Sequence, residues 1–229
     1  MKTLVIAISL CLLPTAMFAQ EVAPRAPASS LTRATGGPLP VDERGFIHRW
    51  LVLEPVPVPG RLTESAVQDA LKLAPLSGAN EPRTDGALTT IQGTQLAWHA
   101  IDTNRYNVNL YHFAYALSKP TSNVLFWVET EVDAPRELAG VRLAIGSNAA
   151  SRWWLNGEPV IALNDDRQTV IDDGVSKRMT LRQGRNVIRA AIINGGGATD
   201  FCARFLDAND QPVTGLRVSL TSPAAGSVK

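Results

Sequence analysis

The sequence is poor in cysteine, in histidine and in net charge, and each shortage disfavours a class of protein. Its 229 residues include two cysteines and three histidines, and 22 basic residues nearly balance 21 acidic ones, for a formal net charge of +1. A chain so close to neutral has no field to attract nucleic acid or an anionic membrane. We therefore expect no nucleic-acid partner. The hydrophobic content of 45% is ordinary for a globular fold and too high for a disordered chain.

The known catalytic and cofactor motifs are also missing. The chain lacks the Gly-x-Ser-x-Gly elbow of α/β-hydrolases, the His-Glu-x-x-His and paired Cys-x-x-Cys zinc motifs, and the glycine-rich fingerprints of phosphate and dinucleotide sites. The histidines His48, His99 and His112 do not have the spacing of metal ligands. We therefore predict that the protein is not an enzyme and needs no catalytic cofactor.

The first 19 residues have the features of a secretory signal peptide. A basic start at Lys2 precedes the apolar run Leu4–Leu13, the helix breaker Pro14 and small residues that end at Ala19. The apolar run is far shorter than the roughly 20 residues that a membrane-spanning helix needs. We therefore predict cleavage before Gln20, a secreted or periplasmic protein, and no membrane insertion after the leader is removed.

Loss of the leader would remove Cys11 and leave Cys202 as the single cysteine of the mature chain, so no internal disulfide could form. A lone cysteine in an exported protein is either a buried, inert thiol or a reactive one. The apolar neighbours Phe201 and Phe205 favour burial in a strand. Arg204 is the only basic residue close in sequence, which gives little support for a reactive thiolate.

The mature chain divides into a linker, a domain and a tail. Residues 20–45 are rich in Pro, Ala, Ser and Gly and predict a flexible linker, residues 46–220 predict one β-sandwich domain, and residues 221–229 predict a flexible tail. The only helix that the pattern predicts is Thr63–Leu73, where apolar residues recur at helical spacing. The segment 75–95 predicts a polar, irregular connection.

Short strands separated by turn residues account for most of the domain. Turn residues recur about every eight to twelve positions, which is typical of a sandwich. Asn156-Gly157 is the strongest hairpin signal, because both central residues of a type I′ turn need positive φ. The pattern predicts an all-β, antiparallel sandwich with at most one short helix. The expected strands are Phe46–Leu53, Leu96–Ile101, Leu110–Leu117, Val124–Val132, Val141–Ile145, Arg152–Leu155, Val160–Leu163, Val175–Leu181, Asn186–Ile193, Phe201–Leu206 and Leu216–Leu220.

Six segments of the domain carry comparable turn motifs: Trp50–Pro55, Thr130–Pro135, Leu143–Asn148, Trp154–Val160, Leu181–Asn186 and Phe201–Leu206. These motifs resemble those of the galactose-binding-like β-sandwich, a jelly roll found beside catalytic domains in bacterial acetylxylan esterases and glycoside hydrolases. The resemblance covers residues 46–220, and it departs from the family pattern at Glu54, where glycine usually precedes the proline. It implies a jelly-roll fold and, because no catalytic domain accompanies it here, a non-catalytic module.

The tryptophans are the best candidates for a glycan site. An indole face packs against the C–H face of a sugar ring, while neighbouring polar groups bond its hydroxyls. Strand alternation places Trp153 with Leu155 on the core face and Trp154 with Arg152 on the other. We predict Trp154 or Trp98 as the stacking group and Arg152 as its polar neighbour. The alternative is that Trp154 packs beneath a loop.

The loop from Asn164 to Asp173 carries two pairs of adjacent carboxylates. Asp165 and Asp166, Asp172 and Asp173, with Asn164, could supply the hard oxygen ligands that calcium prefers. The resemblance implies the same, since sandwich modules of this type often hold a structural calcium. Paired carboxylates also serve glycosidases, which hold them about 5 to 10 Å apart across a cleft. Solvated turn residues are the simpler interpretation.

These features leave three functions open. The first is a secreted, non-catalytic carbohydrate-binding or polysaccharide-associated module with a glycan partner, which predicts an exposed aromatic beside polar side chains in a concavity. The second is a structural or protein-interaction domain of the cell envelope with a protein partner, which predicts a broad apolar patch. The third is a hydrolase with an unrecognised active site, which predicts an acid–base pair buried in a cleft.

Overall fold

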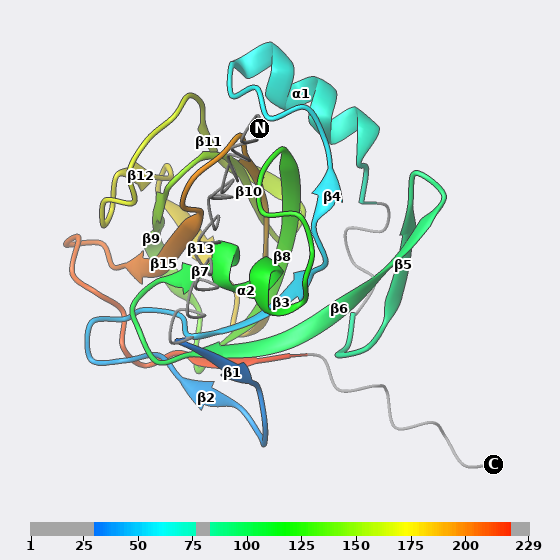
Figure 1. Cartoon of the computed structure of the whole chain (residues 1–229). Coiled ribbons are helices and arrows are strands. Elements are labelled where there is room, and N and C mark those ends of the chain that lie inside the picture. Colours follow the sequence, from blue (N-terminus) through cyan, green and yellow to red (C-terminus); the bar gives the residue numbers. More distant parts are fainter. Residues whose placement is uncertain (1–29, 77–82, 221–229) are drawn as a thin grey trace, which may run out of the picture.

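Two antiparallel sheets form the body of the molecule (Figure 1). The computed structural model describes residues 30–76 and 83–220. The two antiparallel sheets and the way they pack confirm the all-β sandwich that the sequence predicts. The predicted signal peptide (1–19) and tail (221–229) lie outside the described residues. Within the described ranges, no helix is long and apolar enough to cross a membrane.

The larger sheet has 11 strands. They are β1 (Leu31–Arg33), β2 (Leu39–Pro40), β3 (Arg49–Leu53), β4 (Val56–Pro57), β5 (Leu88–Ile91), β6 (Thr94–Thr103), β8 (Val124–Ala134), β10 (Ala150–Leu155), β11 (Glu158–Leu163), β14 (Gly184–Asn194) and β16 (Arg217–Ser219). Its main path runs β1-β6-β3-β8-β14-β10-β11, with β16 and β4 paired to β8, β2 to β16 and β5 to β6. At its centre β8 and β14 pair along their whole length.

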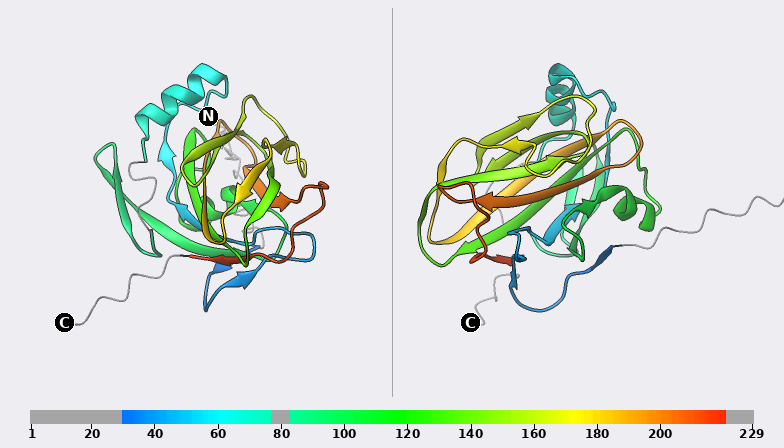
Figure 2. Two further views of the ribbon diagram at one scale, coloured as in Figure 1. Left: turned by 180° about the vertical axis from the view of Figure 1, so that it is seen from behind. Right: turned by 90° about the vertical axis from the view of Figure 1, so that its left-hand side faces the viewer.

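The smaller sheet packs against one face of the larger one (Figure 2). Its strands are β7 (Val108–Asn109), β9 (Leu138–Ser147), β12 (Gly174–Val175), β13 (Met179–Leu181) and β15 (Asp200–Leu206), in the order β12-β9-β15-β7 with β13 paired to β9. The apolar inner faces of both sheets form the main core. Its centre is aromatic: Trp50, Trp153 and Phe201 meet with ring centroids 4.9 to 6.2 Å apart.

The outer face of the larger sheet is apolar as well. The helix α1 (Glu64–Leu73) covers part of it with Val67 and Ala70, which pack in a second core with Leu125 and Trp127 of β8. The first half of strand β8 is therefore buried on both faces, which explains why Val124–Val128 is a continuous apolar run rather than an alternation. The helix predicted over Thr63–Leu73 is confirmed.

The segment Leu110–Leu117 is predicted as a strand, but in the structure Leu110–Ala116 forms the helix α2. Asn109 precedes it, and its Oδ1 accepts a hydrogen bond from the His112 backbone N–H at 2.8 Å, as an N-cap residue does. Leu110, Phe113 and Ala114 are buried at the i, i+3, i+4 spacing of a helix. The prediction of at most one short helix is therefore wrong, because the described residues contain two.

Two segments predicted to be irregular contain paired strands. Residues 30–45 of the predicted linker are part of the fold, since Leu31–Arg33 pairs with β6 and Leu39–Pro40 with β16. The connection over 75–95 contains β5, which pairs with the start of β6. These edge strands are held by backbone hydrogen bonds, which need no apolar periodicity, so their composition did not reveal them.

The hairpin turn predicted at Asn156-Gly157 is confirmed. Both residues have positive φ, +52° and +88°, and they join β10 to β11. The Asn156 side chain also ties the turn to the neighbouring strand: its Oδ1 accepts the Val187 N–H at 2.9 Å and its Nδ2 donates to Asn186 Oδ1 at 3.0 Å.

Replacing Gly157 with valine should lower the free energy of unfolding by about 1 to 3 kcal/mol, because a β-branched residue resists positive φ. Urea unfolding measures the change. Gly196→Val is the matched control, since Gly196 is outside the positive-φ region and an added Cβ would meet no atom within 4 Å. Equal stability of the Gly157→Val protein and the wild type would contradict the turn assignment.

Candidate functional site

Trp154 lies on the outer face of the larger sheet, as strand alternation predicts. Its neighbour Trp153 is fully buried in the main core, whereas Trp154 is only partly buried. The indole of Trp154 packs against that of Trp127, with ring centroids 5.7 Å apart and an interplanar angle of 36°. β14 runs between their strands, and Ala191 pairs with Trp127 there. The small alanine side chain leaves room for the two indoles to meet.

The two indoles line a cleft of about 210 Å³, which we call the tryptophan cleft. Leu76, Gly157, Val187 and Arg189 complete its lining. The Trp127 indole is fixed, because its Nε1 donates a hydrogen bond to the Ala74 carbonyl at 3.0 Å. Since pockets for drug-sized ligands are about 300 to 1,000 Å³, this cleft has room for a single ring.

A buried charge cluster of Arg83, Glu129 and Arg189 stands beside the cleft. Arg189 and Glu129 are paired across β14 and β8, and Glu129 Oε2 accepts from Arg189 Nε at 2.8 Å and lies 2.7 Å from its Nη2. Arg83 Nη1 lies 3.5 Å from the same oxygen. All three side chains are less than 10% exposed. The cluster therefore gives the cleft a guanidinium, that of Arg189, whose position is fixed by its carboxylate partner.

Trp98 has no exposed surface on which a sugar ring could stack. Its side chain is fully buried, its Nε1 donates to Thr89 Oγ1 at 2.8 Å, and the Arg83 guanidinium lies over its ring, 5.5 Å from the centroid. The prediction of Trp98 as a stacking group is therefore wrong. Its strand is apolar on this face because α1 and the segment before β5 cover the sheet there.

Arg152 shares a face with Trp154, as predicted, but it does not line the cleft. Its guanidinium donates to the Leu163 carbonyl and to Asn164 Oδ1, both at 2.7 Å, and so holds the loop that follows β11. Burial lowers the pKa of Arg152, and the nearby Glu64 partly offsets this. Arg189, and not Arg152 as predicted, is the arginine that lines the cleft beside Trp154.

Two of the four acidic residues predicted to hold calcium, Asp172 and Asp173, are paired with arginines. Asp172 Oδ1 accepts from Arg204 Nε at 2.9 Å, and the second oxygen is bonded to the same guanidinium. Asp173 forms an ion pair with Arg167. Each carboxylate is therefore already neutralised by a cation, which would compete with a metal ion for the same oxygens.

The remaining residues of this loop do not converge either. The Asn164 amide oxygen is bonded by Arg152, and the Asp165 backbone N–H donates to Leu62, while Asp166 borders a shallow groove at the loop surface. Among the described residues, no group of three or more His, Cys, Asp or Glu side chains could hold a metal ion. The described side chains are therefore not gathered into the calcium site that the sequence predicts.

We expect a chelator to leave the melting temperature unchanged, because arginines rather than a metal stabilise the Asn164–Asp173 loop. Thermal melts of purified protein with EDTA, and again with excess calcium, provide the measurement. A melting temperature that falls with EDTA and recovers with calcium would show that the loop binds the ion after all.

Cys202 is buried, as its apolar neighbours predict. Burial raises the pKa of its thiol to about 12. The thiolate is therefore scarce at neutral pH, and Cys202 is an inert core residue rather than a nucleophile.

The chain matches no protein-family model and no curated protein sequence. Among solved structures it is similar to a PA14 sugar-binding domain from an RTX adhesin, at 12% identity and a TM-score of 0.44 over 76% of this chain and 100% of that one. The PA14 domain of the MpAFP antifreeze protein gives 11% identity and a TM-score of 0.38 over 76% and 93%. A β-glucosidase from Kluyveromyces marxianus gives 18% identity and a TM-score of 0.38, over 69% of this chain and 15% of that one. TM-scores this low assign neither a family nor a ligand.

Proposed function

We propose that this chain is a secreted, non-catalytic glycan-binding module and that the tryptophan cleft is its binding site. The observation that supports this most is the partly exposed Trp154, packed on a fixed Trp127 and beside Arg189 in one concavity. An exposed indole supports the apolar face of a sugar ring, and a guanidinium donates hydrogen bonds to its oxygens. Secretion rests on the signal peptide predicted over residues 1–19, and the galactose-binding-like jelly roll on the turn motifs.

Preorganisation of the cleft favours binding. The Trp127 indole is hydrogen-bonded to the end of α1, and Arg189 is bonded to Glu129, so neither side chain has to be ordered when a ligand arrives. Ordering a long side chain at an interface costs roughly 0.5 to 1.5 kcal/mol. Trp154 would lose some freedom on binding, but its contact with Trp127 already restricts it.

The size of the cleft suggests which part of a glycan it holds. Gly157 of the β10–β11 turn lines one side, where it presents no side chain. A cleft with room for one ring at a turn suits a terminal or branch sugar, from which the rest of the glycan extends past the turn into solvent. Glu129 is bound by two arginines, so it is not free to act as the general acid of a hydrolase.

The experiment that tests the proposal is an affinity screen of the purified mature protein against immobilised plant, bacterial and fungal polysaccharides. We expect at least one polysaccharide to retard the wild-type protein in affinity gel electrophoresis. Free oligosaccharide from the same polymer should reverse the retardation. Unretarded migration on every polysaccharide would contradict the proposed function.

A further inference from the structure

A second, larger cleft of about 450 Å³ lies where β1, β6 and α2 meet. We call it the histidine cleft, because His99 of β6 and His112 of α2 both line it. Its apolar wall includes Ile101, Phe113 and Leu117. It shares no lining residue with the tryptophan cleft, and its volume is within the usual range for a small-molecule site.

The charged groups around the histidine cleft are already paired with one another. At its rim Arg33 Nη2 lies 2.6 Å from Asp85 Oδ2, and Asp85 Oδ1 accepts the Ala100 N–H at 2.9 Å. Behind His99, Lys119 Nζ lies 3.1 Å from Glu54 Oε2. Because each charge has a partner of opposite sign, a charged ligand would have to break an ion pair or remain unpaired. The cleft therefore suits an uncharged ligand.

The pKa values of the two carboxylates agree with this pairing. Burial raises the pKa of each carboxylate, but hydrogen bonds and nearby positive charges lower it by more. For Asp85 these come from the Ala100 N–H and from Arg33. For Glu54 they come from Lys119 and from the Ala97 N–H. The net pKa of each group is lowered, so both remain ionised at neutral pH. Neither carboxylate therefore has a proton with which to donate a hydrogen bond to a ligand.

The two ring nitrogens of His99 differ in exposure, and neither has a hydrogen-bond partner among the described residues. Its Nε2 is buried and faces Glu54 Oε1 at 3.6 Å, while its ring packs edge-on against Phe113, with centroids 5.5 Å apart at 72°. Its Nδ1 is not buried and has no hydrogen-bond partner within residues 30–76 and 83–220. An imidazole that carries its proton on Nε2, the nitrogen nearer Glu54, has Nδ1 as an acceptor. The ligand should therefore supply a donor.

We propose that the histidine cleft binds an uncharged aromatic alcohol. Its ring packs against the aromatic corner of His99 and Phe113 and the aliphatic Ile101, and its hydroxyl donates to His99 Nδ1. Aromatic rings favour such edge-to-face arrangements over face-to-face ones. This site is independent of the proposed glycan site.

The probes that test this are 4-methylphenol and its methyl ether, 4-methylanisole, which has the same ring but no hydroxyl hydrogen. In calorimetric titrations of the full mature protein we expect the phenol to bind about tenfold more tightly than the ether. The charged analogues 4-methylbenzoate and 4-methylbenzylamine should bind more weakly than the phenol. Absence of phenol binding, equal binding of phenol and ether, or tighter binding of a charged analogue would overturn the proposal.

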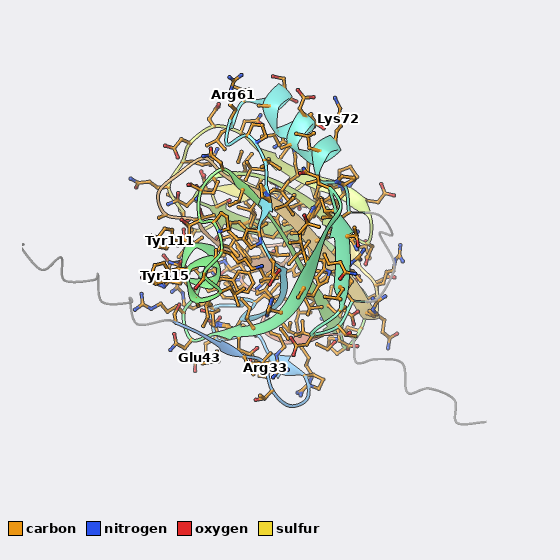
Figure 3. The ribbon with its side chains drawn as sticks, turned by 45° about the vertical axis from the view of Figure 1, so that its right-hand side comes forward. Arg33, Glu43, Arg61, Lys72, Tyr111 and Tyr115 are labelled. Atoms are coloured by element: carbon orange, nitrogen blue, oxygen red, sulfur yellow. The ribbon has the colours of Figure 1, made fainter. Side chains whose placement is uncertain are left out.

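Two variants locate the site. His99→Phe keeps an aromatic ring against Phe113 but removes Nδ1, so it should bind phenol and ether equally. Ala116→Trp, at an exposed position on the rim, should obstruct the cleft and abolish binding of both probes. Tyr111→Phe is the control, because Tyr111 is on α2 at the outer edge of the molecule (Figure 3) and does not line the cleft.

A phenol preference retained by His99→Phe, or full binding by folded Ala116→Trp, would overturn the assignment. If His99→Phe does not fold, the Ala116→Trp result decides alone, because its substitution adds a side chain at an exposed position and leaves the His99–Glu54 contact intact.

Discussion

Replacing Glu129 with alanine should lower the free energy of unfolding by about 3 to 5 kcal/mol, the usual cost of breaking a buried ion pair by removing one partner. The Glu129 side chain is 3% exposed and joins two guanidinium groups, those of Arg83 and Arg189, which are also buried. Its loss leaves two like charges close together in a region of low dielectric constant. The change would also release Arg189 from the position that the tryptophan cleft requires.

Urea unfolding of wild type and Glu129→Ala measures the effect. Asp69→Ala is the matched control, since Asp69 pairs with Lys72 on the exposed side of α1 and both side chains are mostly exposed. A surface pair of this kind contributes about 0 to 1 kcal/mol. A Glu129→Ala protein that loses no more stability than Asp69→Ala would show that the buried charge cluster does not stabilise the fold.

Replacing Trp154 with alanine should weaken glycan binding about ten- to hundredfold, which corresponds to the roughly 1 to 3 kcal/mol of an aromatic stacking contact. Trp154→Phe should retain most of the affinity, because it keeps an aromatic face over Trp127. Calorimetry with the glycan identified by the affinity screen gives both values.

Stability is the control that makes this comparison meaningful. Trp154 packs on the second core as well as lining the cleft, and truncating a core tryptophan costs roughly 3 to 5 kcal/mol of folding free energy. Each variant must therefore be folded at the assay temperature by circular dichroism. Full-strength binding by folded Trp154→Ala would exclude the residue from the site.

Local sequence rules gave the right answer where the structure is locally determined. The turn at Asn156 and Gly157 needs positive φ, which asparagine and glycine adopt readily, so these residue types predict the turn. The alternation of side chains along β10 places Trp153 and Trp154 on opposite faces of the sheet. The same rules gave the all-β class and the helix α1. These features depend on a few neighbouring residues, so no knowledge of the tertiary contacts was needed.

The cleft's polar side could not be predicted in this way. Arg189 stands beside Trp154 because β14 pairs with β10 in one register, and it meets Glu129 because β14 pairs with β8 in another. The two partners are 60 residues apart. Arg152 is nearer to Trp154 in sequence and lies on the same face of the sheet. Its guanidinium, however, is hydrogen-bonded to the end of β11 and the loop that follows it. Strand order and register decide which arginine reaches the cleft.

Composition misled in the acidic loop for a similar reason. Asp172 resembles a calcium ligand while only the loop itself is considered, but its partner Arg204 comes from β15. Asp173 instead pairs with Arg167 of the same loop. At Leu110–Ala116 the missed signal was local: Asn109 is a good N-cap residue, and buried positions at helical spacing follow it. That signal was present in the sequence.

The most direct test of glycan binding at the tryptophan cleft uses the five indole N–H signals in a ¹⁵N-correlated NMR spectrum. The indole N–H groups of Trp50 and Trp153 are buried and bonded to Ile47 and Ser151, whereas Trp154 is at the cleft surface. Titration with the glycan should shift the Trp154 signal, and to a lesser extent that of Trp127, while the two core signals remain in place. Saturating glycan that leaves the Trp154 and Trp127 signals unchanged would contradict the site.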